Sequence, residues 1–319
     1  MMDDYTLPVD SPTRFEGRVV LLTGVGRSGT SILGKLIGSM DRTYYLFEPA
    51  VMKLLPALCV LDSDRKAVYG SALRALLFED YVLQVVHGRA LNFNRQDDSC
   101  VEHYMLRSDI EARWSTLRRR DDAIAYLDRQ DARYVIKTPE FQPLSEILED
   151  AFPDMKLIHI TRNGNDVVSS AVARGWYSDT YMNENIVDWV RKGDQGGCNV
   201  PWYLDEESQA HFGGWNVETR AAAVWRCLTD HGIRHSEARP GQSMEVSYEE
   251  LVRDPDGTTS RTADYLGRMP TDLTRKHIKA IKAFEINRYP SVEHKLQEPE
   301  RGKYVALMRQ LGYMASERG

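Results

Sequence analysis

The chain has 319 residues, of which 41 are Lys or Arg and 47 are Asp or Glu, so its formal net charge is −6. Hydrophobic residues make up 42% and charged residues 28%, the balance of an ordinary globular protein. The mild acidic excess disfavours a general binder of nucleic acid or of anionic membranes, because those partners need a broad basic surface. It leaves room for a small basic pocket that binds a small anion.

Three further features narrow the class of protein. No stretch approaches the roughly 18 apolar residues of a membrane span. The start, MMDDYTLPVDSPTRF, is acidic and contains two prolines, so it lacks the basic and apolar regions of a signal peptide. The four cysteines form no C-x-x-C pair, which disfavours a zinc site or a redox dithiol and predicts reduced, structural thiols. We therefore expect a cytoplasmic protein, with residues 1–15 as an N-terminal extension.

Strands and helices alternate along the chain. Short β-branched apolar runs predict strands, and apolar residues that recur every three or four positions predict helices. In chain order we expect a strand at 18–23, a helix at 30–40, a strand at 44–47, a mostly helical stretch at 50–130 with long helices at 68–86 and 110–129, a strand at 133–136, a helix at 141–152, a strand at 156–161, a helix at 166–174, a strand at 243–246, and further helices up to residue 313.

This alternation predicts the α/β class: a parallel sheet flanked by helices on both faces. The strands are spread from residue 18 to residue 246, too widely for two sequential domains, so residues 16–319 are expected to form a single domain. Within it, residues 176–215 hold eight aromatic residues and five glycines. Such a composition is typical of a lid or substrate insertion over a site, and equally of a satellite core beneath a long loop.

The most informative motif is Gly-Val-Gly-Arg-Ser-Gly-Thr-Ser at residues 24–31, between the first strand and the first helix. Glycines let the backbone curl so that several N–H groups converge, and the positive end of the helix faces the bound anion. The spacing of Gly24 and Gly29 matches G-x-x-x-x-G-K-[ST], but Thr30 stands in the lysine position. No strand ends in an aspartate suited to magnesium, so the loop indicates a P-loop architecture without ordinary NTPase chemistry.

The segment TGVGRSGTSILGKLIGSMDRTYYLFEP resembles the phosphosulfate-binding loop of sulfotransferases that use 3′-phosphoadenosine 5′-phosphosulfate (PAPS). It is most similar to the carbohydrate branch, in which an Arg-Ser-Gly-[Ser/Thr]-Ser loop precedes a Phe-Glu-Pro or Tyr-Glu-Pro element. The resemblance covers about residues 18–49 and 133–176 and, more loosely, 221–267. It implies that PAPS is the donor and that the loop holds it. The implied donor-binding residues are Gly26, Arg27, Ser28, Gly29, Thr30 and Ser31.

A second anion site is predicted where the strand at 156–161 meets the next helix. Arg162 at a strand end beside a helix N-terminus is suited to hold a phosphate through its planar fork of donors. Ser170 follows eight residues later, a spacing similar to the family's 3′-phosphate motif. The family usually has Arg-Asp-Pro-Arg here, whereas this chain has Arg162-Asn163-Gly164-Asn165. Taken alone, Arg162 is also typical of a helix-capping arginine.

Transfer of a sulfuryl group to a hydroxyl needs a base for the acceptor proton and cations for the developing charge. Glu48, between Phe47 and Pro49, occupies the position of the base in the resembling enzymes, and partial burial of its carboxyl would favour proton uptake. Arg27 resembles the residue that contacts the bridging oxygen, and Lys137 at the end of a strand resembles the family's donor-directed lysine. Cytosolic members of the wider family use a histidine as base, but no motif supports His87 or His103 in this chain.

The resemblance thus implies a PAPS-dependent sulfotransferase that works without a metal on a hydroxyl acceptor, such as a sugar or a secondary metabolite. Two alternatives stay open: an atypical P-loop kinase for nucleotides or small molecules, and a non-catalytic nucleotide-binding protein. The family's glycine-rich nucleotide loop near the C-terminus has no clear match; residues 299–303 are a weak candidate and are also typical of a basic turn before a helix. The acceptor and the oligomeric state are not predicted.

Overall fold

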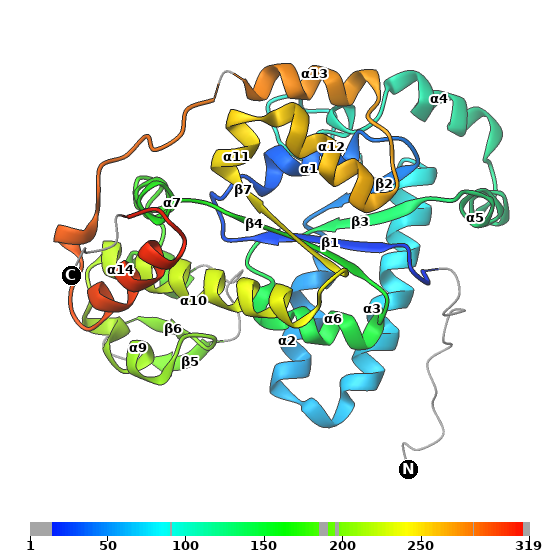
Figure 1. Cartoon of the computed structure of the whole chain (residues 1–319). Coiled ribbons are helices and arrows are strands. Elements are labelled where there is room, and N and C mark those ends of the chain that lie inside the picture. The colour runs from blue at the N-terminus through cyan, green and yellow to red at the C-terminus, as the bar shows by residue number, and fades with distance from the viewer. Residues whose placement is uncertain (1–14, 90, 185–190, 195–197, 283, 315–319) are drawn as a thin grey trace, which may run out of the picture.

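Five parallel strands form the central sheet of the computed structural model (Figure 1). The structure describes residues 15–89, 91–184, 191–194, 198–282 and 284–314. The sheet order is β2-β3-β1-β4-β7, and all four pairings are parallel. The strands are β1 (Val19–Gly24), β2 (Thr43–Phe47), β3 (Arg133–Lys137), β4 (Lys156–Thr161) and β7 (Ser243–Ser247).

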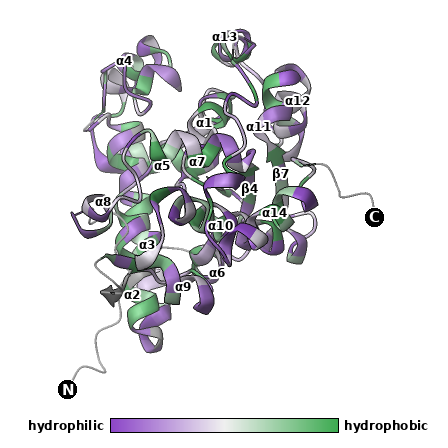
Figure 2. Ribbon diagram, turned by 90° about the vertical axis from the view of Figure 1, so that its left-hand side faces the viewer, coloured by the Kyte–Doolittle hydropathy of each residue, from purple (hydrophilic) through white to green (hydrophobic). Residues whose placement is uncertain are grey.

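Alternation along the strands divides the apolar core between the two faces of the sheet. Val19 and Leu21 of β1 pack in one cluster, and Val20 and Leu22 pack in another. Figure 2 shows that the helices around the sheet carry both hydrophilic and hydrophobic residues. The first cluster is covered by α2 (Val51–Leu61), α3 (Lys66–Asp80), α5 (Arg120–Arg129) and α6 (Ser145–Ala151). The second is covered by α1 (Thr30–Gly38), α11 (Tyr248–Arg253), α12 (Pro255–Leu266) and α13 (Asp272–Ile281).

A third cluster lies beside the β4 side of the sheet. Buried Trp225 of α10 packs on Tyr304 of α14, with 5.1 Å between the ring centroids. Tyr177, Phe212 and Trp215 are also buried here, so part of the aromatic segment forms a satellite core. Trp189 of that segment lies outside the described residues. The elements are α7 (Gly164–Val172), α8 (Asp179–Glu184), β5 (Arg191–Asp194), β6 (Asn199–Pro201), α9 (Glu206–His211), α10 (Val217–Ala238) and α14 (Glu300–Gln310).

The expected fold class, a single-domain parallel α/β sheet with helices on both faces, is confirmed. One expected helix is wrong: residues 110–129 are not continuous but divide into α4 (Arg107–Thr116) and α5. The break occurs at Arg119, which is extended and whose N–H donates to the Asp122 side chain 3.0 Å away, so a new helix start is capped there. Within the described part of the chain, no helix is long and apolar enough to cross a membrane.

Candidate functional site

The loop at residues 24–31, called the phosphate loop below, joins the end of β1 to the first turn of α1. Gly29 precedes the helix with a φ of 94°, a left-handed conformation that glycine adopts without steric cost. Because glycine has no side chain to cap α1, the first N–H groups of the helix receive no side-chain cap from Gly29. Ser28 Oγ is buried here and has no hydrogen-bond partner among the described residues. The loop therefore presents unsatisfied donors, as an anion site requires.

Arg27 connects the phosphate loop to β4 and α7. Its Nε donates to Ser170 Oγ at 3.1 Å, and its carbonyl accepts a hydrogen bond from the Arg162 guanidinium at 3.0 Å. Burial, and then the like charges of Arg174 and Arg162, lower the pKa of Arg27 below its ordinary value. Three cations thus gather at one place, although the sequence separates Arg27 from the other two by more than a hundred residues. An anionic ligand would relieve their mutual repulsion.

Arg162 is more constrained than the sequence suggested. Its guanidinium pairs with the buried Asp166 at 2.8 Å and stacks over the Tyr248 ring, 4.0 Å from the centroid. Its Nε is buried and has no hydrogen-bond partner among the described residues. Arg162 therefore braces the loop and the start of α7, and it retains one unused donor.

Glu48 and Lys137 form an ion pair at the ends of β2 and β3. The Lys137 side chain is only 2% exposed; its ammonium also lies 3.3 Å from Ser31 Oγ and 4.1 Å from the centroid of the Phe47 ring. Burial lowers the pKa of Lys137 below its ordinary value of 10.5, against the opposing effect of the Glu48 carboxylate. The sequence predicted partial burial of Glu48, and its side chain is 28% exposed. The sequence did not predict that Lys137 and, at 3.9 Å, Lys53 both approach its carboxylate.

A cleft of about 430 Å³ opens over these residues. Arg27, Ser31 and Glu48 line it directly. Lys137 lies behind Glu48 and Ser31, and Ser170 contacts Arg27 from the α7 side. The predicted residues therefore converge on one place, but only some of them face the cavity. The other lining residues are Gly26, Phe47, Met52, Lys53, Asp98, Thr138, Pro139, Glu140, Phe141, Leu144, Trp176 and Tyr181.

Three parts of this lining were not singled out from sequence as site residues. Trp176 and Tyr181 stack with 6.0 Å between ring centroids and provide an aromatic wall. Asp98 pairs with Lys35 of α1 at 2.6 Å; partial burial raises the pKa of Asp98, but Lys35 lowers it more, so the net direction is down. Asp98 stands on an irregular loop inside the stretch expected to be helical, where periodicity carries no signal. Glu140 was missed as well.

Backbone strain is concentrated in the same cleft. Among the described residues, six that are not glycine have positive φ, and three of them line the cleft: Arg27 at 73°, Glu48 at 47° and Glu140 at 61°. Left-handed backbone is costly for such side chains and persists where the surroundings enforce it, often at functional sites. The strain therefore marks Glu140 together with the two residues chosen from sequence.

Other sequence candidates lie elsewhere. The described lining of the cleft contains no histidine; His103 instead packs near His277, with 6.4 Å between the ring centroids. Residues 299–303 form the first turn of α14 rather than a nucleotide loop, and Lys303 pairs with Asp205 at 2.8 Å. No group of three or more His, Cys, Asp or Glu side chains suited to a metal ion occurs within the described ranges.

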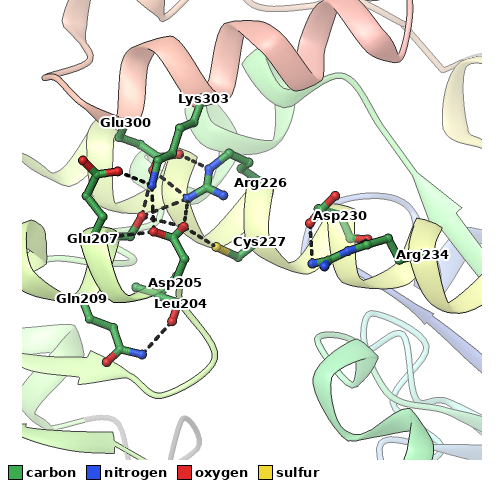
Figure 3. Close-up of polar contacts among 11 residues, drawn as sticks. Leu204, Asp205, Glu207, Gln209, Arg226, Cys227, Asp230, Arg234, Glu300 and Lys303 are labelled. Atoms are coloured by element: carbon green, nitrogen blue, oxygen red, sulfur yellow. Dashed lines mark hydrogen bonds and ion pairs between the residues drawn. The ribbon is translucent and has the colours of Figure 1, made fainter.

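Lys303 belongs to a second concentration of charge, away from the cleft (Figure 3). We call it the charge cluster; it consists of Asp205, Glu207, Arg226, Glu300 and Lys303. Glu300 is fully buried and accepts from Arg226 Nε at 2.6 Å, and Asp205 caps α9 through the N–H of Ser208. These contacts fasten α9 and α14 to α10.

Comparison with known proteins gives a consistent picture. A family model described as the sulfotransferase family matches residues 20–272. No curated protein matches the sequence. Among solved structures, the chain is similar to the sulfotransferase domain of the Synechococcus PCC 7002 olefin synthase, with 14% identity and a TM-score of 0.50 over 93% of this chain and 95% of that one. It is also similar to the sulfotransferase domain from the curacin biosynthetic pathway, with 14% identity and a TM-score of 0.51 over 94% and 99%. At this identity the two structures show a shared fold.

Proposed function

Because this chain belongs to the sulfotransferase family, we propose that it transfers a sulfuryl group from PAPS to a hydroxyl acceptor bound in the cleft. The observation that carries the proposal is the meeting of Arg27, Ser31 and Glu48 on one cavity, with Lys137 joined to both Ser31 and Glu48. A cation, a phosphate loop and a carboxylate are what sulfuryl transfer requires.

The residues at the phosphate loop fit the donor. The buried Ser28 Oγ and Arg162 Nε need hydrogen-bond partners, which phosphate oxygens supply. The loop amides from Gly26 to Ser31 would hold the phosphosulfate, and Arg162 with Ser170 would hold the 3′-phosphate. When bound, PAPS supplies the sulfuryl group, and its 5′-phosphate is part of the leaving group.

Three residues of the chain then have separate roles in the transfer: Glu48, Arg27 and Lys137. Lys137 binds Glu48 Oε1, which fixes the carboxylate, and Oε2, which lies 3.9 Å from the Lys53 ammonium, takes the proton of the acceptor hydroxyl. Arg27 faces the cleft and neutralises the negative charge that grows on the bridging oxygen as the bond to sulfur breaks. The ammonium of Lys137, held beside Ser31, adds a second positive charge on the same side.

We further propose a carbohydrate or small polyhydroxylated acceptor. The stacked pair Trp176 and Tyr181 offers flat apolar faces to the C–H surface of a sugar ring, and the carboxylates of Glu48 and Asp98 offer acceptors for its hydroxyl groups. This choice of acceptor depends on the cleft lining alone.

One experiment tests the proposal. Purified protein is incubated with radiolabelled PAPS and a panel of hydroxyl acceptors in EDTA, with Glu48→Gln and Arg27→Ala beside the wild type. We expect transfer by the wild type and a loss of about 100-fold or more in each variant. The matched control is Glu146→Gln, an exposed carboxylate of α6 outside the cleft.

The outcomes discriminate between the candidate functions. Absence of PAPS binding by calorimetry would overturn the proposal, and magnesium-dependent turnover of ATP would favour a kinase. Full activity of Glu48→Gln would show that Glu48 is not the base. The activity of Arg27→Ala would then decide whether PAPS is bound at the phosphate loop.

A further inference from the structure

Glu140 lies directly against the phosphate loop, yet the chemistry described above does not use it. Its Oε1 accepts a hydrogen bond from the Gly26 N–H at 3.2 Å, and its own N–H donates to the Gly24 carbonyl at 2.8 Å. A Cβ added to Gly26 would lie 2.7 Å from Glu140 Oε1 and 2.9 Å from Cζ3 of Trp176. The carboxylate is thus closely fitted over the glycine of an anion-binding loop.

The backbone of Glu140 indicates that this position is enforced. Glu140 follows Thr138 and Pro139 at the end of β3 and adopts a φ of 61°, which favours glycine over a residue with a side chain. A glycine would be less strained there but would place no carboxylate at Gly26. A glutamate in this strained conformation points to a role for its side chain.

We propose that Glu140 is a positioning residue that holds the Gly26 amide when the donor is absent and competes with the donor for it. The proposal rests on the proposed function, because it takes the phosphate loop to be the donor site. A carboxylate and a phosphate or sulfuryl oxygen cannot both sit at one N–H without strong like-charge repulsion. Donor binding therefore turns the Glu140 side chain away from the loop, into the cleft that it already lines beside Trp176 and Tyr181.

The two possible roles of Glu140 predict opposite changes in donor affinity when its charge is removed. If the carboxylate only supports the fold of the loop, its neutralisation loosens the loop and weakens donor binding. If it competes with the donor, neutralisation removes the repulsion and strengthens donor binding. The substitution Glu140→Gln suits this test because the amide keeps the size and a hydrogen-bond acceptor while it removes the charge.

The experiment is calorimetric titration of the full chain with adenosine 3′,5′-bisphosphate, the product that PAPS leaves behind. We expect Glu140→Gln to bind it roughly fivefold to tenfold more tightly than the wild type, the scale of one like-charge contact screened by water. Glu146→Gln, which makes the same change in net charge outside the cleft, should bind as the wild type does. Binding by Glu140→Gln that equals or falls below wild-type binding would overturn the inference.

Two further arms keep the test decisive. If Glu140→Gln does not fold, Glu140→Asp replaces it: the shorter side chain draws the carboxylate back from Gly26, and an intermediate gain in affinity is expected. Unchanged or weaker binding by a folded Glu140→Asp would then count against competition. Wild-type protein that fails to bind the bisphosphate would refute the proposed function and this inference together, whereas wild-type binding without a gain in the variant refutes this inference alone.

Discussion

The cleft and the charge cluster both concentrate ionised side chains, and they arrange them in opposite ways. In the charge cluster, the cations Arg226 and Lys303 each meet at least two carboxylates, and the buried Glu300 is satisfied on both oxygens. At the cleft, Arg27 bonds a hydroxyl, and among the described residues it forms no ion pair. The charge cluster is complete without a ligand, whereas Arg27 faces the cavity of the cleft and the unpaired donors Ser28 Oγ and Arg162 Nε are buried next to it.

The comparison shows that a displaced pKa alone does not identify a functional site. Hydrogen bonds and charges hold the pKa of Asp205 far below its usual range despite the opposing effect of burial, and they raise the pKa of Arg226 in the same way. The groups with these pKa shifts pair with one another, and such pairing is a structural role. At the cleft the shift of Arg27 has a different cause, burial among like charges, and that cause is what an anion would remove.

Removal of Glu300 should have the largest effect, and on stability rather than on activity. Glu300→Ala removes the fully buried partner of Arg226, whose side chain is 12% exposed, and leaves Asp205 as its remaining carboxylate partner; breaking an ion pair of this kind costs about 3–5 kcal/mol of unfolding free energy. We expect a clearly lower midpoint in urea unfolding and a normal rate per folded molecule. A normal midpoint, or a rate that falls while the fold is retained, would contradict the separation of the two regions.

Removal of Arg27 should have the reverse pattern. Arg27→Ala takes away a cation positioned at the cleft, so kcat/KM should fall by about 100-fold to 1,000-fold, or 2.7–4 kcal/mol. The unfolding midpoint should change little, because the side chain gives up one hydrogen bond and escapes two like charges. Steady-state kinetics beside urea unfolding check both statements, and Arg27→Lys serves as the charge-retaining variant. Wild-type kcat/KM in Arg27→Ala would show that the cation is not used.

The protonation of Lys137 should make both the stability and the activity of the protein depend on pH. Its pKa is lowered in the folded protein, so the folded protein releases this proton at a lower pH than the unfolded chain, where 10.5 applies. Between the two values the unfolded chain binds more protons, and the contribution of Lys137 to stability rises with pH. Activity should do the opposite, with kcat falling about tenfold per pH unit once the ammonium is lost.

The measurement is a pH–rate profile beside urea unfolding at each pH. The alkaline limb of the wild type should lie below pH 10.5, and in Lys137→Arg it should move upward, because the guanidinium stays charged. An alkaline limb at the same pH in both proteins would assign it to another group.

Much of the cleft was predictable because its parts lie in short local patterns. Apolar runs located the strands, and the carboxyl ends of parallel strands meet at one edge of the sheet, so Arg27, Glu48 and Lys137 were expected near one another. The contact of Arg27 with Ser170 spans 143 residues and depends on β4 lying next to β1. The spacing motif singled out Ser170 together with Arg162 and did not predict this contact.

The rest had no local signal. Asp98 belongs to an irregular loop fixed by its own turns. Glu140 reaches the phosphate loop only because β3 lies next to β1 and because its φ is positive, and neither feature can be recognised from the local sequence. The charge cluster joins Asp205, Arg226 and Glu300 from three helical regions, and no local pattern in the sequence links them. Long-range pairing of ordinary polar residues is decided by packing, and a single sequence does not display it.

Two serines give the finest test of the comparison, since each hydroxyl contacts a key arginine. Ser170 accepts from Arg27 at the cleft, and Ser208 accepts from Arg226 in the charge cluster at 2.9 Å. Ser170→Ala should weaken binding of adenosine 3′,5′-bisphosphate by about threefold to tenfold, the range of one hydrogen bond, with an unchanged unfolding midpoint. Ser208→Ala should lower the unfolding free energy by about 1 kcal/mol and leave the Kd unchanged. If both variants lost stability alone, Ser170 would be a structural residue, and the second anion site predicted with Arg162 would lose one of its two ligands.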